Sequence, residues 1–143
     1  MTDEQRYEGL SQQSEAGKQL EILIVDDEKS IREMQLQFLE KILRGLRAYS
    51  VELANNGAEA VDKIGLKKGL YDLVLLDNRM PDMSGIEVYS YIKREHPEQA
   101  GKVVFVTATS YDLTDAGINA AFLTKPFSYA SFAGFIKDFF KLG

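Results

Sequence analysis

Residues 22–28 read Ile-Leu-Ile-Val-Asp-Asp-Glu, a short apolar run that ends in acidic side chains. Four successive apolar residues, most of them β-branched, favour a strand that is buried on both faces, because a strand with one wet face would alternate apolar and polar positions. Such strands lie inside parallel sheets whose two faces are covered by helices. The stretch therefore predicts an α/β fold with Asp26 and Asp27 at the end of a buried strand.

Strand and helix signals alternate through the rest of the chain. Further strand-like runs lie at residues 51–54, 71–77, 102–107 and 121–123. Helix starts are indicated by residues that favour N-caps, namely Ser30 (in a capping-box sequence), Asn56, Ser84 and Ser128. Five strands that alternate with helices imply right-handed βαβ units, and hence a doubly wound parallel sheet covered on both faces.

Residues 1–19 differ in composition from the residues that follow. They are polar, rich in Gln, Glu and Ser, and carry no apolar run. Such a segment cannot bury enough apolar surface to become ordered by itself. We therefore expect an N-terminal tail or linker at residues 1–19 and one folded domain at residues 20–143.

Composition and charge exclude several classes of protein. The chain has no cysteine, which removes disulfides and thiolate chemistry. Its net charge of −5 opposes binding to a phosphate backbone, so we expect no direct contact with nucleic acid. No apolar run approaches the ~20 residues that span a bilayer, and no secretory signal pattern opens the sequence. We expect a cytoplasmic protein without membrane contact.

Side chains that suit phosphate and metal chemistry follow the predicted strands. From the first strand to the fifth they are Asp26, Asp27, Asp77, Thr107 and Lys125. Each of them alone is commonly a cap, a turn residue or a solvated side chain. Functional groups of open parallel sheets gather at the carboxyl ends of the strands, so these residues should converge on one edge. Crowded carboxylates repel one another unless a cation joins them, and such oxygen ligands suit Mg²⁺.

Taken together, four stretches of the sequence resemble the receiver domain of two-component response regulators, including chemotaxis regulators. They are Ile22–Glu28, Leu75–Gly85, Val106–Ala108 and Leu123–Phe127, in the family's order and near its spacing. The resemblance covers roughly residues 20–142. It implies a flavodoxin-like (βα)5 fold with strand order 2-1-3-4-5, and a signalling switch rather than an enzyme.

The resemblance also implies how such a switch would work. Asp77 would accept a phosphoryl group from a histidine kinase or a phosphotransfer protein, and Thr107 and Lys125 would bind the phosphoryl oxygens. Phosphoryl transfer needs a nucleophile in line and positive charge against the equatorial oxygens. Drawing Thr107 inward leaves space that Phe122 can fill, which would alter the surface offered to an unidentified protein target.

A metal site follows from the same resemblance. Asp27, Asp77 and the backbone carbonyl of Arg79 would bind Mg²⁺ directly, and Asp26 would act largely through water. Mn²⁺ can take the place of Mg²⁺ in a site of this kind. The cation would offset the repulsion between Asp77 and an incoming phosphate.

Three further positions are assigned by the family's pattern. Pro126 is expected to follow a cis peptide bond that sets the loop of Lys125. Arg79 and Thr109 occupy variable positions that tune the rates of phosphorylation and hydrolysis. We expect the Arg79 side chain to lie over the pocket and to alter the access of the attacking water.

The stretch between the fourth and fifth strands departs from the family's pattern. Residues 110–119 are about one helical turn shorter than usual and contain Gly117, a poor helix former. We expect a short or irregular fourth helix, which argues against the family's usual dimer face and favours a monomer or weak dimer. Short fourth helices also resemble receivers that are attached to hybrid histidine kinases.

Three other functions fit parts of the pattern. A phosphohydrolase with an aspartate nucleophile would carry an Asp-x-Asp pair after the first strand, whereas here the nucleophile follows the third strand and Arg79 stands two residues later. A flavin-binding module needs a phosphate loop after the first strand, where Asp26 and Asp27 would repel phosphate. A docking module that is never phosphorylated has no use for the full set of Asp, Thr and Lys side chains. Turnover of small phosphate esters would separate the phosphohydrolase from a switch.

Overall fold

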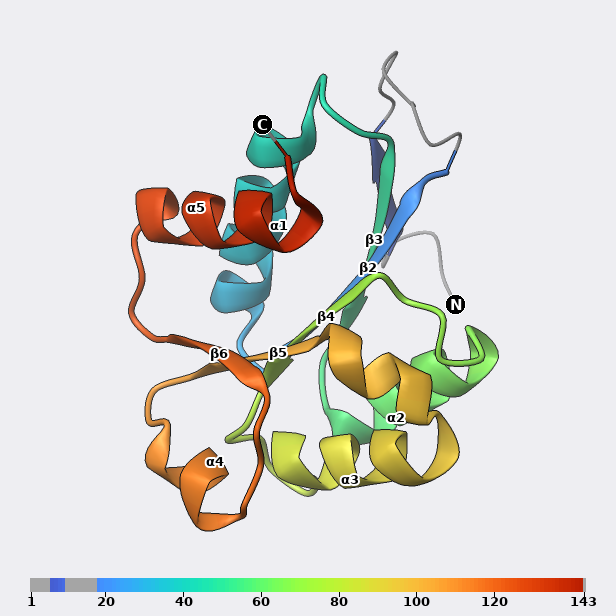
Figure 1. The fold of residues 1–143 in the computed structure, drawn as a ribbon, viewed down its shortest axis with the longest axis vertical. Helices are drawn as coiled ribbons and strands as arrows, with labels where there is room; N and C mark the ends of the chain where they lie inside the picture. The colour runs from blue at the N-terminus through green and yellow to red at the C-terminus, as the bar shows by residue number, and fades with distance from the viewer. Residues whose placement is uncertain (1–5, 10–17, 143) are drawn as a thin grey trace.

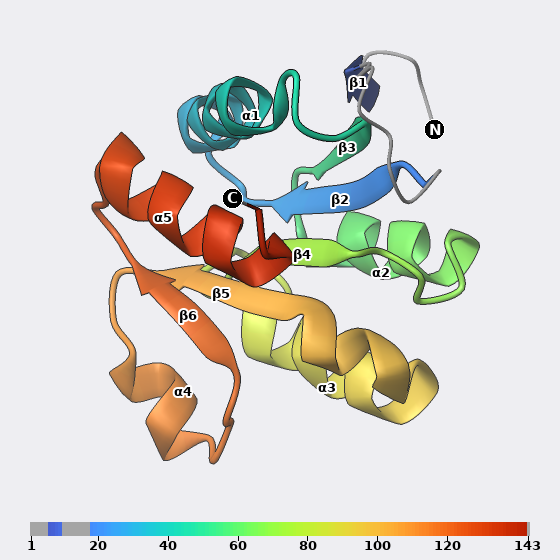
Figure 2. The same ribbon diagram turned by 45° about the horizontal axis from the view of Figure 1, so that its top comes forward.

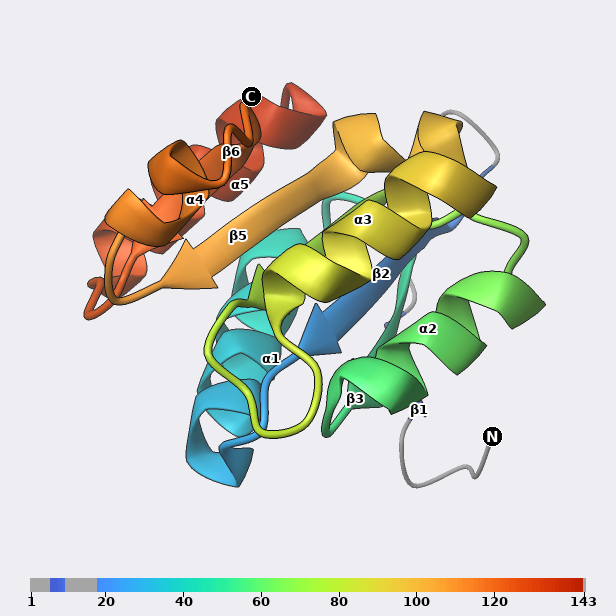
Figure 3. The ribbon, with the colours of Figure 1, turned by 90° about the horizontal axis from the view of Figure 1, so that it is seen from below.

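Five parallel strands form the core of the sheet in the computed structural model, which describes residues 6–9 and 18–142. The strands are β2 (Leu20–Val25), β3 (Tyr49–Ala54), β4 (Leu73–Asp77), β5 (Val103–Thr107) and β6 (Ala121–Thr124). Their spatial order is β3-β2-β4-β5-β6, which confirms the predicted order 2-1-3-4-5. The arrowheads of β2 and β5 point toward the same edge of the sheet (Figure 3).

Helices cover both faces of the sheet, as predicted (Figure 1, Figure 2). On one face lie α1 (Lys29–Leu43) and α5 (Tyr129–Phe140), and on the other lie α2 (Gly57–Leu66) and α3 (Gly85–Glu95). A 3₁₀ helix, η2 (Pro97–Lys102), connects α3 to β5. Within the described ranges, no helix is long and apolar enough to cross a membrane.

The apolar strands separate two hydrophobic cores. Ile22 and Ile24 of β2 belong to the core beneath α1 and α5, whereas Leu23 and Val25 belong to the core beneath α2 and α3. All four side chains are at most 1% exposed. Burying one such side chain contributes about 1.5–3 kcal/mol, so a strand that is apolar at every position stabilises both halves of the fold.

A further strand, β1 (Arg6–Gly9), extends the sheet beyond β3. It runs antiparallel to β3, with Arg6 opposite Glu52. The sequence analysis predicts no strand at these residues. A short strand at a sheet edge can be held by backbone hydrogen bonds alone, and such bonds require no pattern of apolar side chains. Residues 1–5 and 10–17 of the predicted tail lie outside the described residues, and the domain boundary at residue 20 stays a prediction.

Side-chain caps fix the starts of three helices at the predicted residues. In each of them the cap oxygen accepts a hydrogen bond from the backbone N–H three residues later; the caps are Asn56, Ser84 and Ser128. The capping box predicted at Ser30 is wrong, because α1 already begins at Lys29 and Ser30 lies inside its first turn. The N-cap is Glu28, whose N–H donates to Oδ1 of Asp26 at 2.9 Å, so a site residue braces the start of α1.

The fourth helix is short, as predicted. α4 (Tyr111–Asp115) has five residues, of which Leu113 is buried. Gly117 follows with a φ of +72°, a left-handed conformation that glycine adopts without strain and that ends many helices. The chain then passes to β6 without further helix, so α4 covers little of the sheet beside β6 (Figure 2).

Two glycines should respond in opposite ways to replacement by alanine. A Cβ on Gly85 would overlap the backbone of Asp77 and Asn78, whereas a Cβ on Gly134 in α5 meets nothing within 4 Å. We expect Gly85→Ala to lower the free energy of unfolding by about 1–3 kcal/mol through overpacking. Gly134→Ala should raise it by about 0.5–1 kcal/mol through helix propensity. Urea unfolding measures both, and equal effects would contradict the close packing at Gly85.

Candidate functional site

Three carboxylates meet at the carboxyl edge of the sheet. Asp77 is the last residue of β4, and Asp26 and Asp27 directly follow β2, its neighbour in the sheet. One carboxylate oxygen from each residue lies within 4.8 Å of the other two. Asp26 and Asp77 are buried, with 0% and 5% exposure, whereas Asp27 is exposed. The structure thus brings together the acidic residues that the sequence places at this edge.

Lys125 supplies positive charge between two of these carboxylates. Its Nζ lies 2.9 Å from Oδ2 of Asp26 and 3.2 Å from Oδ1 of Asp77. The backbone N–H of Lys125 donates to the carbonyl of Thr107 at 2.8 Å, which ties the loop after β6 to the end of β5. The peptide bond between Lys125 and Pro126 is cis, the geometry expected from the sequence.

The acidic cluster of Asp26, Asp27 and Asp77 carries more negative charge than Lys125 neutralises. Burial, followed by the charge of Asp26, raises the pKa of Asp77 from 3.8 to about 6, although Lys125 acts to lower it. Burial acts to lower the pKa of Lys125, but the hydrogen bonds and charges of Asp26 and Asp77 outweigh it and hold that pKa above its usual value. Two buried carboxylates share one ammonium, so the charge of Asp26 adds to burial in raising the pKa of Asp77, while both carboxylates oppose the effect of burial on the pKa of Lys125.

The donor set fits a hard divalent cation. Mg²⁺ is usually bound by one or two carboxylates together with water and phosphate oxygens, and Mn²⁺ accepts the same oxygen ligands. Burial is the main cause of the raised pKa of Asp77, and a cation at Asp26, Asp27 and Asp77 would offset the repulsion that adds to it. The acidic cluster is therefore compatible with a divalent metal site.

The hydroxyl of Thr107 is bonded to the loop that follows β5. Thr107 Oγ1 donates to the carbonyl of Thr109 at 3.1 Å and lies 3.3 Å from the Thr109 N–H, which donates to it. Thr107 is 1% exposed, whereas Phe122 on β6 is 44% exposed. The ring of Phe122 is therefore largely outward here, and its predicted coupling to Thr107 stays a prediction.

Two residues that the sequence does not single out, Asn78 and Asp112, connect the site to α4. Asn78 Oδ1 accepts from the Ile86 N–H at 3.0 Å, and its Nδ2 donates to Oδ2 of Asp112 at 3.3 Å. Arg79 Nε donates to the same carboxylate at 3.1 Å. The guanidinium expected over the pocket is thus bound to α4, and the predicted influence of Arg79 and Thr109 on reaction rates stays a prediction.

Sequence alone carries a weak signal for one of these two residues and none for the other. Asn78 directly follows Asp77 at the end of an apolar, strand-like run, so its position in the sequence is a usable clue, and the structure shows it buried. Asp112 lies in a polar stretch like many others, and its contacts exist because α4 packs beside the β4–α3 loop.

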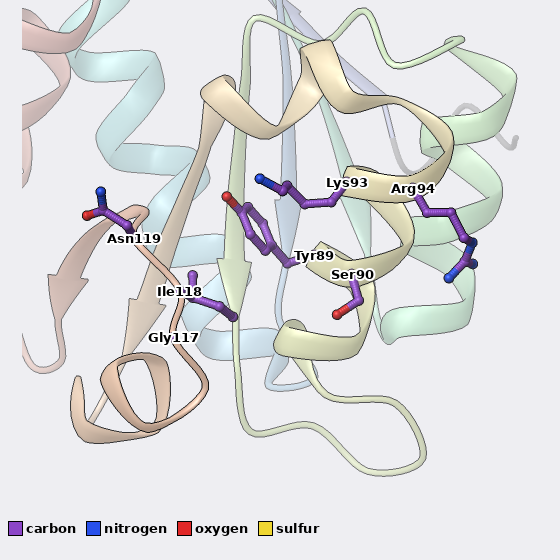
Figure 4. Close-up of a pocket in the computed structure, with 7 residues that line it drawn as sticks. All are labelled: Tyr89, Ser90, Lys93, Arg94, Gly117, Ile118 and Asn119. Atoms are coloured by element: carbon purple, nitrogen blue, oxygen red, sulfur yellow. The ribbon is translucent and has the colours of Figure 1, made fainter.

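Hollows in the described part of the chain lie outside the acidic cluster, and two of them adjoin the segment after α4 and Lys125, respectively. One of about 670 Å³ lies between α3 and the segment after α4 (Figure 4), and it is lined by Tyr89, Ser90, Lys93, Arg94, Gly117, Ile118 and Asn119. Another of about 340 Å³ borders Lys125 and is otherwise apolar, with Ile31, Met34, Ala108, Pro126 and Phe127 in its wall. The carboxylates line neither, so the acidic cluster is a feature of the sheet edge and not the floor of either hollow.

Solved structures with this fold include response regulators. The response regulator TrrA from Thermotoga maritima, solved in complex with Mg²⁺ and BeF, is 32% identical and gives a TM-score of 0.67. The match covers 84% of this chain and 98% of that one. The non-phosphorylated receiver domain of HemR from Leptospira biflexa is 26% identical with a TM-score of 0.70, over 87% of this chain and 97% of that one.

Related proteins include both short and long response regulators. The chemotaxis protein CheY-3 of Vibrio cholerae is 31% identical over 119 residues, which span 80% of this chain and 86% of CheY-3. The transcriptional regulatory protein ZraR of Klebsiella oxytoca is 35% identical over 120 residues, or 80% of this chain and 25% of ZraR. The chain spans a quarter to less than half of the transcriptional regulators ZraR, ResD and DltR.

A family model settles the relationship. The model of the response regulator receiver domain matches residues 22–136, which is most of the chain. That span contains the three carboxylates, Thr107 and Lys125, together with four of the parallel strands and all of β2 but its first two residues. Fold, strand order and acidic edge agree with this match. The chain therefore belongs to the receiver domain family of two-component response regulators.

Proposed function

We propose that this chain is a phosphorylation switch in which Asp77 accepts a phosphoryl group from a phosphohistidine. The observation that carries the proposal is the position of Lys125 Nζ between the buried carboxylates of Asp26 and Asp77. A fixed ammonium beside the nucleophile supplies positive charge where phosphoryl oxygens would gather, and it does so before the reaction begins.

The transfer requires an in-line attack by a carboxylate oxygen of Asp77 on phosphorus. The P–O bond to Asp77 forms as the P–N bond of the donor breaks, and the electron pair of that bond goes to the imidazole nitrogen. The attacking oxygen must be deprotonated, and a pKa of about 6 leaves Asp77 mostly ionised at neutral pH. Lys125 and the hydroxyl of Thr107 would donate hydrogen bonds to the phosphoryl oxygens.

We assign a divalent cation, Mg²⁺ or Mn²⁺, to Asp27, Asp77 and the backbone carbonyl of Arg79, with Asp26 acting through water. When bound, the cation supplies charge that neutralises the phosphoryl oxygens. Support comes from the grouping of the carboxylates within 4.8 Å and from the raised pKa of Asp77. The signal ends when water attacks phosphorus and the P–O bond breaks, which restores the Asp77 carboxylate and releases inorganic phosphate. Arg79 and Thr109 would set the rate of this step.

The output of the switch is a change of surface. Thr107 would exchange its bonds to Thr109 for a phosphoryl oxygen, and Phe122 would turn inward from its exposed position. We propose a histidine kinase or phosphotransfer protein as the donor, and the apolar hollow beside Lys125 favours contact with a protein of this kind. The target is a further protein, reached in the cytoplasm by a monomer or weak dimer without nucleic acid or membrane contact.

Phosphorylation of the intact chain tests the proposal directly. With Mg²⁺ and acetyl phosphate, we expect intact-mass spectrometry to show one added phosphoryl group, which chelation of the metal prevents. Asp77→Asn should remove the label, and Lys125→Ala should slow labelling by about 10²-fold or more, because one preorganised donor to the developing charge is lost. An unlabelled wild type under conditions that label other receivers contradicts the function, and a labelled Asp77→Asn contradicts the site.

The raised pKa of Asp77 predicts how stability depends on pH without metal. Because the folded-state pKa is about 6 and the ordinary value is 3.8, the folded chain holds a proton that the unfolded chain has lost, so stability falls as pH rises between about 4 and 6. Asp77→Asn should therefore raise the free energy of unfolding at pH 8 by about 2–3 kcal/mol, and by little at pH 4.

Urea unfolding at both pH values, in the presence of a metal chelator, measures this difference. The matched control is Asp62→Asn, because Asp62 is exposed on α2. It should change stability by no more than about 0.5 kcal/mol at either pH. If Asp77→Asn behaved like Asp62→Asn, ionised Asp77 would carry no excess repulsion.

A further inference from the structure

The carboxylate of Asp112 on α4 binds the guanidinium of Arg79, which lies two residues after Asp77 in the sequence. Oδ2 of Asp112 lies 3.1 Å from Nε and 3.0 Å from Nη2 of Arg79, and its Oδ1 lies 3.4 Å from Nη2. Asn78 Nδ2 donates to the same carboxylate at 3.3 Å. The two donors directly follow Asp77 in the sequence, so this cluster connects the nucleophile's own loop to α4.

Little else in the described chain fixes the start of α4. Its N-cap, Ser110, makes no side-chain cap hydrogen bond, and Leu113 is the buried residue of the helix. Tyr111 beside Asp112 is 77% exposed. The hydrogen bonds from Arg79 and Asn78 to Asp112 therefore hold the start of this short helix, together with the buried side chain of Leu113.

We propose that Asp112 is a positioning residue that holds Arg79 on α4 while Asp77 is unmodified and loses it to the phosphoryl group. This inference rests on the proposed function. Arg79 stands two residues after Asp77 on one loop, so a change of side-chain rotamer would carry its guanidinium from Asp112 toward a group on Asp77. A bond from Arg79 to the phosphoryl oxygens then breaks the bond to Asp112 and loosens the start of α4, where Asn78 remains as a side-chain donor.

Charge decides the direction of this exchange. Asp112 offers one negative charge, whereas a phosphoryl group adds about −1.5 to −2 and three strong acceptor oxygens that suit bidentate binding by arginine. The side chain of Arg79 is 67% exposed, so its pair with Asp112 is of the weak, solvent-screened kind that a stronger partner can replace.

A movement of α4 would also change the hollow between α3 and the segment after α4. That segment, including Gly117 and Ile118, directly follows the last turn of α4 and forms one wall of the hollow (Figure 4). The Ile118 N–H donates to the Leu113 carbonyl at 2.9 Å, which joins this wall to α4. Release of α4 would therefore change the shape of a surface that lies away from Asp77.

Beryllofluoride with Mg²⁺ is the probe for the first test, because it mimics a phosphoryl group on a carboxylate without turnover. Asp112→Asn removes the competing charge, so it should tighten beryllofluoride binding about two- to fivefold, the value of one weak ion pair. The control, Asp115→Asn, lies on the same helix at an exposed position and should leave the affinity unchanged.

A second background shows whether the effect passes through Arg79. In an Arg79→Ala chain, Asp112→Asn should no longer change the beryllofluoride affinity, because the shared guanidinium is absent. An equal effect in both backgrounds would mean that Asp112 acts through general charge and would overturn the proposal. Asp112→Glu should restore the wild-type affinity, since it keeps the charge.

Amide hydrogen exchange in α4 measures whether the helix loosens when Arg79 leaves Asp112. The effect is expected because coupling between two sites is reciprocal. Beryllofluoride should speed exchange at the amides of Ala116 and Ile118, which donate to α4 carbonyls. Asp112→Asn should show this faster exchange without any ligand. Unchanged protection in both cases overturns the proposal.

The outcomes separate this inference from the proposed function. A wild-type chain that binds no beryllofluoride with Mg²⁺ contradicts the phosphorylation switch itself. A wild-type chain that binds it, together with an Asp112→Asn chain that behaves like Asp115→Asn, refutes the role of Asp112 alone.

Discussion

The contact of the Lys125 ammonium with two buried carboxylates is the constraint on which the rest of the site depends. Removing charged groups from water costs several kcal/mol for each ion, and a buried pair offsets that cost when its geometry is good. Here the compensation is incomplete, because the pKa of Asp77 stays near 6 despite Lys125. Lys125 therefore neutralises the carboxylates of Asp26 and Asp77 only in part. The remaining negative charge lies where a cation and a phosphoryl group would bind together.

Much of this structure could be predicted from local sequence, because the deciding interactions leave a local pattern. A strand buried on both faces has to be apolar at every position, as in residues 22–25, and its end has to be polar where the chain leaves the core. The caps at Asn56 and Ser84 act within one helical turn, and Gly117 marks the end of the short α4. The acidic edge followed because parallel strands bring their last residues to one side.

The remaining features depend on distant parts of the chain and leave no such pattern. β1 is held by strand pairing at an edge, and side-chain type says little about such pairing. Ser30 has the sequence pattern of a helix cap, but α1 begins at Lys29, with Glu28 as its N-cap. The N–H of Glu28 donates to the carboxylate of Asp26, a contact that the pattern around Ser30 does not indicate. Asp112 gained its partners because α4 packs beside the β4–α3 loop, which the sequence of α4 does not reveal.

The separation of the two charges in the sequence has a consequence for synthesis. Lys125 lies 99 residues after Asp26. At about 5–20 residues per second, the ribosome makes the first carboxylate about 5–20 seconds before the ammonium that will neutralise it. If β2 and β4 pair before Lys125 is made, the three carboxylates lie together without their counterion, and protonation of Asp77 or binding of a cation would offset their repulsion. The last βα unit completes the pocket, so a growing chain acquires a working site only when its sheet is finished.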